Sequence, residues 1–184
     1  DSIYQPAEDS YLLDKVLKKE IPKLLKDNPN LGFLEIGAGS GILLETAKEL
    51  GIKPKNIFAT DINQTAVKHC QDQGFNCILS DLFEEVEGQY NIIIFNPPYL
   101  PEDSQGLEPE ESQLATTGGA LGSELINKFL EQAKEYLEEG EDNGRIFILT
   151  SSLTKGIDWK NYKKKLIGKE NLFMEDLFVW ELSL

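Results

Sequence analysis

Apolar and polar positions along the chain follow two periods, one typical of strands and the other typical of helices. Short apolar runs predict strands at residues 31–36, 57–60, 75–79, 90–95, 145–150 and 172–182. Apolar residues spaced three and four apart predict helices at residues 8–26, 41–50, 63–72, 123–137 and 155–167. Because the two kinds of segment alternate, the pattern predicts an α/β fold whose mostly parallel sheet carries helices on both faces.

Local signals add detail at a few points. Pro22 is expected to kink the first helix or to end it early, and Asn63 is a candidate cap for the third. The apolar run at residues 90–95 is typical of a strand in the middle of a covered sheet. The loop at residues 97–121 is long for a compact domain, which indicates a functional or mobile segment. The last strand, rich in β-forming residues, is expected to run antiparallel.

Composition limits the classes of protein that need to be considered. With 184 residues, 40% of them apolar and 27% charged, we expect a single domain over residues 1–184. No apolar run is long enough to span a membrane and no signal peptide is visible, which favours a cytoplasmic protein. Cys70 and Cys77 are too few for a disulfide framework. His69 is the only histidine, which argues against a histidine-based zinc site, so no bound metal is expected.

Charge argues against a protein that binds duplex nucleic acid. The net charge is −14, and Arg145 is the only arginine. A duplex-binding protein usually presents a basic face to the phosphates. The longest basic run, Lys163-Lys164-Lys165, lies inside a predicted helix, and we interpret it as a solvated helix face.

A glycine-rich turn follows the first predicted strand, with the sequence EIGAGSG at residues 35–41. Glycines there let the backbone turn tightly and approach a ligand, and the next helix points its N-terminus at that ligand. A dinucleotide site places its third glycine one position later. Glu35 can also receive the ammonium of an amino-acid moiety. Both features favour S-adenosylmethionine, bound around Gly37 and Gly39, over a nicotinamide cofactor or a plain αβ turn.

Carboxylates also end the second and third predicted strands. Asp61 can accept both hydroxyls of a ribose, and we assign it to the cofactor site together with Ile62. Its alternative role is to cap the helix that follows. Asp81 can accept from an adenine amino group while Leu82 packs on the ring, although an aspartate here also suits an ordinary turn. Three successive strand-end acids predict one crevice at the carboxyl edge of the sheet.

The fourth motif is Asn96-Pro97-Pro98-Tyr99, directly after the strand at residues 90–95. The two prolines stop the strand and stiffen the loop. The Asn96 side-chain oxygen and the Pro97 carbonyl can accept both hydrogens of one planar NH₂ group, and Tyr99 can lie against its flat face. This aims the nitrogen lone pair at a sulfonium methyl, and positioning supplies much of the catalysis. The alternative is a proline turn that only closes a strand.

The chain resembles the HemK family of N5-glutamine methyltransferases. The resemblance is carried by YQPAEDSYLL at residues 4–13, by the E-x-G-x-G-x-G turn and by the Asn-Pro-Pro-Tyr motif. It covers nearly the whole chain and is closest to the short archaeal and eukaryotic branch. It implies a Rossmann-like class I methyltransferase fold with seven strands and an antiparallel last strand, in which residues 1–26 cover the cofactor site.

The resemblance also implies an activity, site residues and partners. The activity is S-adenosylmethionine-dependent methylation of the glutamine in the Gly-Gly-Gln motif of a class 1 translation release factor. A small zinc-binding activator protein is implied as a heterodimer partner. We expect it along residues 75–79, which the expected strand order leaves at a sheet edge, although a naturally tolerated edge is an alternative. The implied glutamine-binding residues are Asn96, Pro97 and Tyr99. The implied cofactor residues are Ser10, Glu35, Gly37, Asp61, Asp81, Leu82 and Asn96.

Two departures from the family pattern bear on this assignment. Ala115-Thr116-Thr117-Gly118-Gly119, followed by Gly122, resembles the Gly-Gly segment of the family, but Thr116 and Thr117 stand where some relatives carry a tryptophan. The tail after Thr150 looks short, which predicts abbreviated last strands.

Two other functions fit the same motifs. Enzymes that methylate exocyclic amines of adenine or guanine in DNA or RNA also carry Asn-Pro-Pro-Tyr, and a degenerate domain can serve as a silent scaffold. The stretch from residue 99 to 127 contains no lysine or arginine, so a phosphate backbone is repelled there and a basic protein surface is attracted. This favours a protein substrate. The carboxylates of that stretch are Glu102, Asp103, Glu108, Glu110, Glu111 and Glu124.

Overall fold

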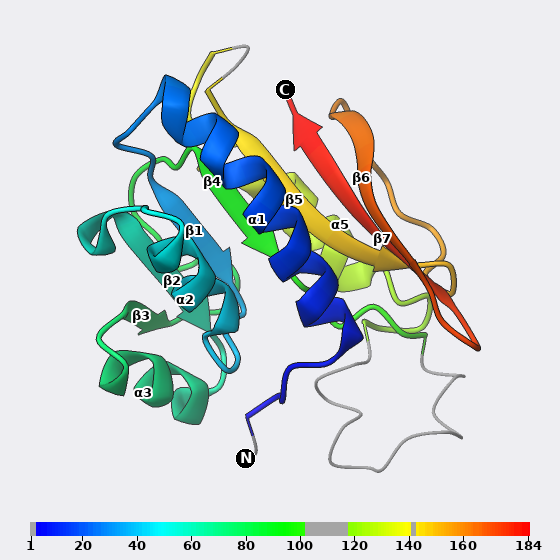
Figure 1. Cartoon of the computed structure of the whole chain (residues 1–184). Coiled ribbons are helices and arrows are strands. Elements are labelled where there is room, and N and C mark those ends of the chain that lie inside the picture. The colour runs from blue at the N-terminus through cyan, green and yellow to red at the C-terminus, as the bar shows by residue number, and fades with distance from the viewer. Residues whose placement is uncertain (1–2, 102–117, 141–142) are drawn as a thin grey trace.

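A computed structural model of the protein describes residues 3–101, 118–140 and 143–184. Within these residues one seven-stranded sheet runs in the order β3-β2-β1-β4-β5-β7-β6 (Figure 1). Strands β1 to β5 pair in parallel, whereas β7 is antiparallel to both β5 and β6. The mixed sheet with a reversed last strand is therefore confirmed. The bounds are β1 Phe33–Ile36, β2 Ile57–Asp61, β3 Asn76–Leu79, β4 Ile92–Phe95, β5 Arg145–Ser151, β6 Lys163–Asn171 and β7 Asp176–Ser183.

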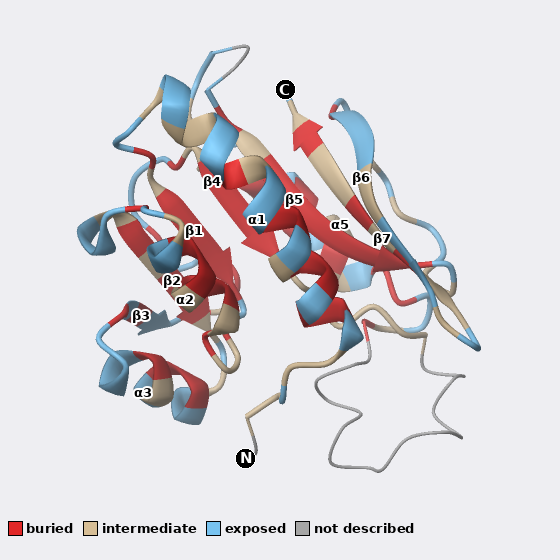
Figure 2. Cartoon of the chain, in the orientation of Figure 1, coloured by how far each residue is buried: buried red, intermediate tan, exposed pale blue. Residues whose placement is uncertain are grey.

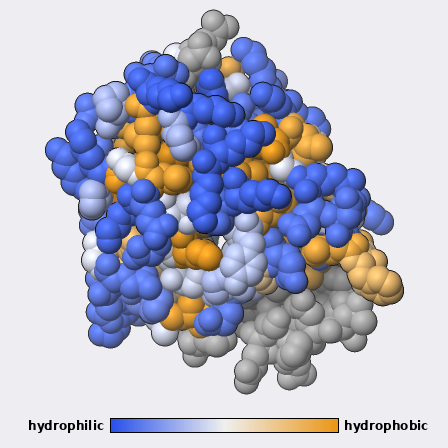
Figure 3. Space-filling model, viewed as in Figure 1, coloured by the Kyte–Doolittle hydropathy of each residue, from blue (hydrophilic) through white to orange (hydrophobic). Residues whose placement is uncertain are grey.

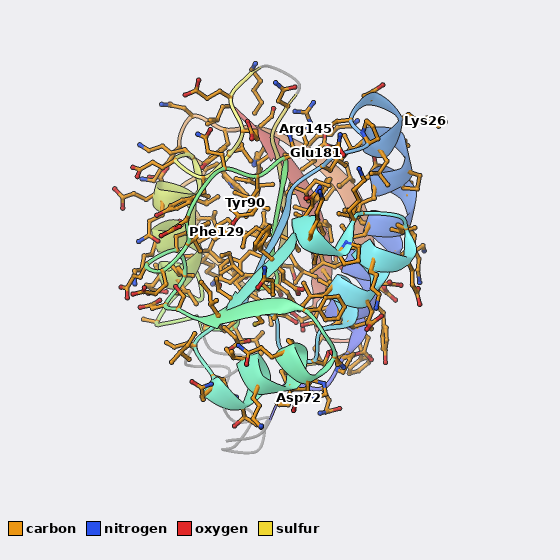
Figure 4. The ribbon with its side chains drawn as sticks, turned by 90° about the vertical axis from the view of Figure 1, so that its left-hand side faces the viewer. Lys26, Asp72, Tyr90, Phe129, Arg145 and Glu181 are labelled. Carbon is orange, nitrogen blue, oxygen red and sulfur yellow. The ribbon has the colours of Figure 1, made fainter. Side chains whose placement is uncertain are left out.

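Helices cover both faces of the sheet, as the alternation predicts. α1 (Glu8–Asp27), α2 (Ile42–Glu49) and α3 (Gln64–Asp72) lie on the face toward the viewer in Figure 1, and α5 (Glu124–Ala133) lies behind. Figure 4 shows the two layers from the side, with Lys26 at the end of α1 on the right and Phe129 of α5 on the left. A 3-10 turn, Pro54–Asn56, precedes β2.

Each face of the sheet has its own apolar core. Alternation within β4 decides which side chains enter which core, because neighbouring residues of a strand point to opposite faces. Ile92 and Ile94 pack on the side of α1 and α2, and Ile93 and Phe95 pack on the side of α5. All four residues of β1 and of β4 are buried, and Figure 2 shows these central strands in red. By this parity, the residue after Phe95 points toward α1.

α1 separates an apolar face from a polar one. Its buried side chains include Leu13, Leu17 and Ile21, and its solvent side is hydrophilic in Figure 3. Pro22 does not end the helix early, because α1 continues five residues beyond it to Asp27. Pro22 is exposed, so its missing N–H removes a hydrogen bond on the solvent side and leaves the buried face intact. No helix in the described ranges is long and apolar enough to cross a membrane.

The helix predicted at residues 155–167 is wrong, and with it the interpretation of the lysine run as a helix face. Residues 155–162 are irregular, and Lys163 begins the nine-residue edge strand β6. Lysines on an edge strand oppose pairing with another chain. Because lysines occupy these positions, the alternating apolar pattern that predicts a strand is not visible in the sequence. Gly168 lets β6 approach α1, because a Cβ there would lie 2.8 Å from Val16 Cγ2.

Several other boundaries differ by one or two residues, and two differ by four for local reasons. The last strand begins at Asp176 rather than at residue 172, because the Leu172 N–H donates to the Glu175 carbonyl in the hairpin turn (2.8 Å). α5 ends at Ala133, and Leu137 instead forms an isolated bridge with Tyr90. With eight residues in β7 and nine in β6, the last strands are not abbreviated.

Candidate active site

The carboxyl ends of β1, β2, β3 and β4 meet at one edge of the sheet, which also holds the start of α1 (Figure 1). This is the edge at which open α/β sheets bind ligands. The residues assigned to the site from the sequence lie near the carboxyl ends of these strands, in the loops that follow them or in the first turn of α1. The fold therefore brings them to one edge of the sheet, although their contacts differ from one another.

The glycine-rich turn is fixed to the end of β2. Gly37, Gly39 and Gly41 have backbone φ angles of 75°, 51° and 80°, values that residues with a Cβ rarely adopt. The Gly37 N–H donates to the Thr60 carbonyl (2.8 Å), and the Gly39 N–H donates to Asp61 Oδ2 (2.9 Å). α2 begins directly after Gly41 with no side-chain cap, so its first N–H groups suit a ligand carboxylate.

Asp61 joins the turn to the helix that follows. Its Oδ1 accepts from the Asn63 N–H (2.8 Å), and its Oδ2 accepts from Gly39. The helix cap itself is Asn63, whose Oδ1 accepts from the Thr65 N–H (2.9 Å), as the sequence predicts. Asp61 is half-buried and Ile62 beside it is 74% exposed, so both are accessible from solvent at this edge of the sheet. An ionised carboxylate has acceptor capacity beyond two N–H groups, which leaves room for hydroxyls of a ligand.

Glu35 lies below the turn as a buried acid. It is two residues after Phe33 and so faces α1 and α2, with 3% of its surface exposed. Its Oε2 is buried without a hydrogen-bond partner among the described residues. Burial raises the pKa of the Glu35 carboxyl well above its usual value, and the neighbouring Cys70 and Asp61 raise it further. A buried acceptor of this kind suits a ligand cation such as an ammonium.

Asp81 and Leu82 follow β3 at the same edge of the sheet. Asp81 Oδ2 accepts from Lys128 Nζ of α5 at 2.9 Å, a contact that the sequence did not reveal. Both side chains are more than a third exposed, so the ion pair contributes little to stability. Leu82 is buried with φ of 50°, and its carbonyl accepts from Thr60 Oγ1 (3.3 Å). The loop that follows β3 is thus attached to the end of β2. The assignment of Asp81 and Leu82 to the adenine stays a prediction.

Asn96 follows β4 and points toward α1, as the parity of the strand requires. Its Nδ2 donates to Asp9 Oδ2 at 3.2 Å. Its Oδ1 is buried and has no partner among the described residues. Pro97 is buried, and the ring of Tyr99 packs against both apolar cores. The Asn96 side chain therefore offers a buried acceptor beside a rigid loop, as a planar NH₂ substrate requires.

Two glycines support the loop that carries Tyr99. A Cβ on Gly118 would overlap the Pro98 carbonyl, and a Cβ on Gly122 would overlap the Tyr99 carbonyl. The Gly118 N–H also donates to the Leu100 carbonyl (3.0 Å). Glycine is therefore required at both positions, because the backbone at Gly118 and Gly122 lies directly against the backbone at Pro98 and Tyr99. The other predicted substrate-side residues, Glu102, Asp103, Glu108, Glu110, Glu111, Thr116 and Thr117, lie outside the described residues.

Asp9 is a site residue to which the sequence gave no role. It is 4% exposed in the first turn of α1, where an acid is normally solvated, and it contacts Asn96 across 87 positions of sequence. Tyr4 Oη donates to Asp9 Oδ2 (3.0 Å), and Ser10 lies buried beside it. The sequence contains a signal for the burial of Asp9, because position 9 lies on the same helix face as the apolar residues Leu12, Leu13 and Val16.

Comparisons with known proteins agree with this geometry. The family model described as "Methyltransferase small domain" matches residues 13–112. The chain is 37% identical to a putative protein N5-glutamine methyltransferase of Methanocaldococcus jannaschii, over 83% of this chain and 74% of that protein. The chain belongs to the small-domain methyltransferases.

Within these methyltransferases the chain falls in the family of protein N5-glutamine methyltransferases, as the resemblance to HemK predicts. It is also 29% identical to the eRF1 methyltransferase catalytic subunit of Schizosaccharomyces pombe, over 74% of this chain and 68% of that protein. The crystal structure of a ribosomal protein L11 methylase from Lactobacillus delbrueckii subsp. bulgaricus superposes with a TM-score of 0.61 at 17% identity, covering 100% of this chain and 82% of that one. This structural likeness confirms the class I methyltransferase fold.

Proposed function

We propose that this methyltransferase transfers the methyl group of S-adenosylmethionine to N5 of the glutamine in the Gly-Gly-Gln motif of a class 1 translation release factor. The observation that carries the proposal is the buried Asn96 Oδ1 at the carboxyl edge of the sheet, which has no hydrogen-bond partner in the part of the chain that the structure describes. The names of the similar proteins from Methanocaldococcus jannaschii and Schizosaccharomyces pombe support a glutamine of a release factor as the acceptor. Because translation takes place in the cytoplasm, we place the enzyme there.

The residues of the crevice fit this cofactor. Glu35 would hold the ammonium, because its buried Oε2 has no partner among the described residues. The turn at Gly37 and Gly39, with the start of α2, would hold the carboxylate. The remaining cofactor assignments are Asp61 and Ile62 for the ribose, Asp81 and Leu82 for the adenine, and Ser10 and Asn96 beside the reacting group. When bound, the cofactor supplies a sulfonium methyl that is already activated for transfer.

The chain's own groups then position the acceptor nitrogen. Asn96 Oδ1 and the Pro97 carbonyl would accept its two hydrogens, which fixes the plane of the amide, and the Tyr99 ring would lie along that plane. Holding the nitrogen in an attack geometry accounts for much of the rate enhancement. No strong base is required beforehand, because a proton leaves after the nitrogen has become cationic. The start of α1 covers this part of the site.

The direct test is to incubate the enzyme, with and without an activator protein, with S-adenosylmethionine and release factor. Mass spectrometry is expected to find one added methyl on the Gly-Gly-Gln glutamine. A release factor with glutamate in place of that glutamine is the matched control, because it lacks the NH₂ group and should stay unmodified. Methyl transfer only to DNA or RNA would favour the nucleobase alternative. Cofactor binding without transfer to any substrate would favour the silent scaffold.

We further propose that a zinc-binding activator protein docks along edge strand β3. This strand is at the end of the sheet, and Ile78 and Leu79 are 40% and 48% exposed. An edge that pairs with no other strand of the described ranges and carries exposed apolar side chains suits strand addition by another chain. At the substrate side, the carboxylates between residues 99 and 127 suit a basic protein as substrate, because they would repel the phosphate backbone of a nucleic acid.

The docking proposal predicts an asymmetry between the two edges of the sheet. Ile78→Glu is expected to reduce co-purification of the activator by at least about tenfold, because it places a charge in an apolar interface. Leu166→Glu is the matched control, since Leu166 lies on the opposite edge strand β6 and is 44% exposed. Size-exclusion chromatography of co-expressed chains measures both. Equal loss of the heterodimer in the two variants, or no loss in either, contradicts docking at β3.

A further inference from the structure

The two ends of the Asn96 amide have different environments. Nδ2 donates to Asp9 Oδ2, whereas Oδ1 is buried without a partner among the described residues. An amide rotated by 180° has nearly the same shape but exchanges its donor and its acceptor. In that orientation Nδ2 would face the substrate, and two NH₂ groups cannot bond to each other. Recognition of a planar NH₂ group therefore depends on which way the Asn96 amide points.

Asp9 is built to hold one orientation only. Within the described residues, the Asp9 carboxylate only accepts hydrogen bonds: from the Ser10 N–H (2.6 Å) and Ser10 Oγ (3.2 Å) at Oδ1, and from Tyr4 Oη (3.0 Å) and Asn96 Nδ2 at Oδ2. An ionised carboxylate only accepts. A rotated Asn96 would place an oxygen against this buried carboxylate, and that contact is repulsive.

We propose that Asp9 is a positioning residue for methyl transfer, which fixes the Asn96 amide so that Oδ1 faces the acceptor nitrogen. This inference rests on the proposed function, because it needs an NH₂ acceptor at Asn96. It also explains why an acid is buried in the first turn of α1. The contact joins the N-terminal segment to the end of β4, so α1 acts on the reaction geometry in addition to covering the cofactor site.

Asp9→Asn tests the proposal with almost no change in shape. Ser10 N–H still needs an acceptor at Oδ1, so the new amide nitrogen is expected to face Asn96. Asn96 then gains a hydrogen bond only by rotating, which turns its Nδ2 toward the substrate. We expect turnover to fall about 100-fold. The affinity for S-adenosylhomocysteine should change far less, as measured by titration calorimetry. Asp14→Asn on the same helix is the control, and it should leave turnover unchanged.

An exchange of the two side chains separates orientation from mere structural support. In the double variant Asp9→Asn with Asn96→Asp, the amide at position 9 donates to one oxygen at position 96, and the second oxygen accepts from the substrate. This restores both the pairing and the net charge. We expect the turnover of the double variant to be at least about tenfold higher than that of Asp9→Asn alone. A structural role for Asp9 predicts instead that the second substitution adds further loss.

A measurement without substrate tests the orientation directly. The side-chain NH₂ signals of Asn96 in a nitrogen–proton NMR spectrum should show a hydrogen bond to a carboxylate in the wild type and lose it in Asp9→Asn. If the wild-type enzyme methylates only nucleobase amines, the release-factor assignment fails, yet the same variants still test Asp9 on that NH₂ group. Full turnover of Asp9→Asn, no recovery in the exchange variant, or unchanged NH₂ signals would each overturn the proposal.

Discussion

Replacing Asn96 with alanine is expected to lower the turnover of the methyltransferase by about 100-fold or more, with a much smaller effect on cofactor affinity. The substitution removes the buried Oδ1 that accepts from the substrate nitrogen. It also leaves Asp9 Oδ2 with one donor fewer, Tyr4 Oη remaining at 3.0 Å. The nitrogen can still enter the site, but its lone pair is no longer held in line. Steady-state kinetics with release factor as substrate measure kcat and KM separately.

Asn91 provides a matched control at the other end of β4. Its Oδ1 accepts from the Gly32 N–H (2.9 Å) and its Nδ2 donates to the Asn143 carbonyl (3.1 Å), far from the crevice. Asn91→Ala should lower the melting temperature by a few degrees, because a partly buried backbone donor loses its partner, and should leave kcat unchanged. Undiminished turnover of Asn96→Ala, or an equal loss in both variants, would count decisively against the assigned role.

The alternating pattern was sufficient to predict the central sheet and the edge at which the site lies. β4 is a continuous apolar run and β1 is apolar apart from Glu35, and acids or asparagine stand at or just after the strand ends, so Glu35, Asp61, Asp81 and Asn96 could be placed at one edge of the sheet. Parallel strands make this inference simple, because their carboxyl ends meet at one edge. Helix α3 was equally predictable, since its cap, Asn63, is a local signal.

Contacts between distant residues could not be predicted in this way. The hydrogen bond from Asn96 to Asp9 joins positions 87 residues apart, and the Lys128–Asp81 pair joins positions 47 apart. Strand β6 was missed because tertiary pairing with β7 overrides a local pattern crowded with lysines. The burial of Glu35 follows from packing under α1 and α2, so the sequence placed the acid at the strand end and left its pKa unpredicted.

Glu35 gives the second large expected effect, in which stability and cofactor binding change in opposite directions. Its pKa is raised in the folded protein without ligand, chiefly by burial. The folded form therefore retains a proton that the unfolded chain has already lost, and stability falls as pH rises from the ordinary carboxyl pKa through the raised one. Glu35→Gln removes this ionisation. We expect the ligand-free variant to melt at a higher temperature than the wild type at mildly alkaline pH.

The same substitution should weaken cofactor binding. A ligand ammonium pairs with the ionised Glu35, so binding to the protonated form must release a proton, and affinity should rise with pH through the raised pKa until the ammonium itself deprotonates. Loss of a buried, charged hydrogen bond is worth about 1.5–3 kcal/mol, which corresponds to about a 10- to 150-fold weaker Kd for Glu35→Gln. Calorimetry in two buffers of different ionisation enthalpy measures both the Kd and the released proton.

Glu49→Gln on the same side of the sheet is the control for these measurements. Glu49 is exposed at the end of α2, so its replacement should alter neither the melting curve at alkaline pH nor proton release. A Glu35→Gln protein that binds as tightly as the wild type and still releases a proton would show that another group receives the ammonium. If it melts lower at alkaline pH than the wild type, the unpartnered Oε2 has a structural partner in solution. If Glu35 is a buried carboxylate that binds a cationic ligand, Glu35→Gln should have both effects. The ligand-free variant should be more stable than the wild type at alkaline pH, and it should bind the cofactor more weakly.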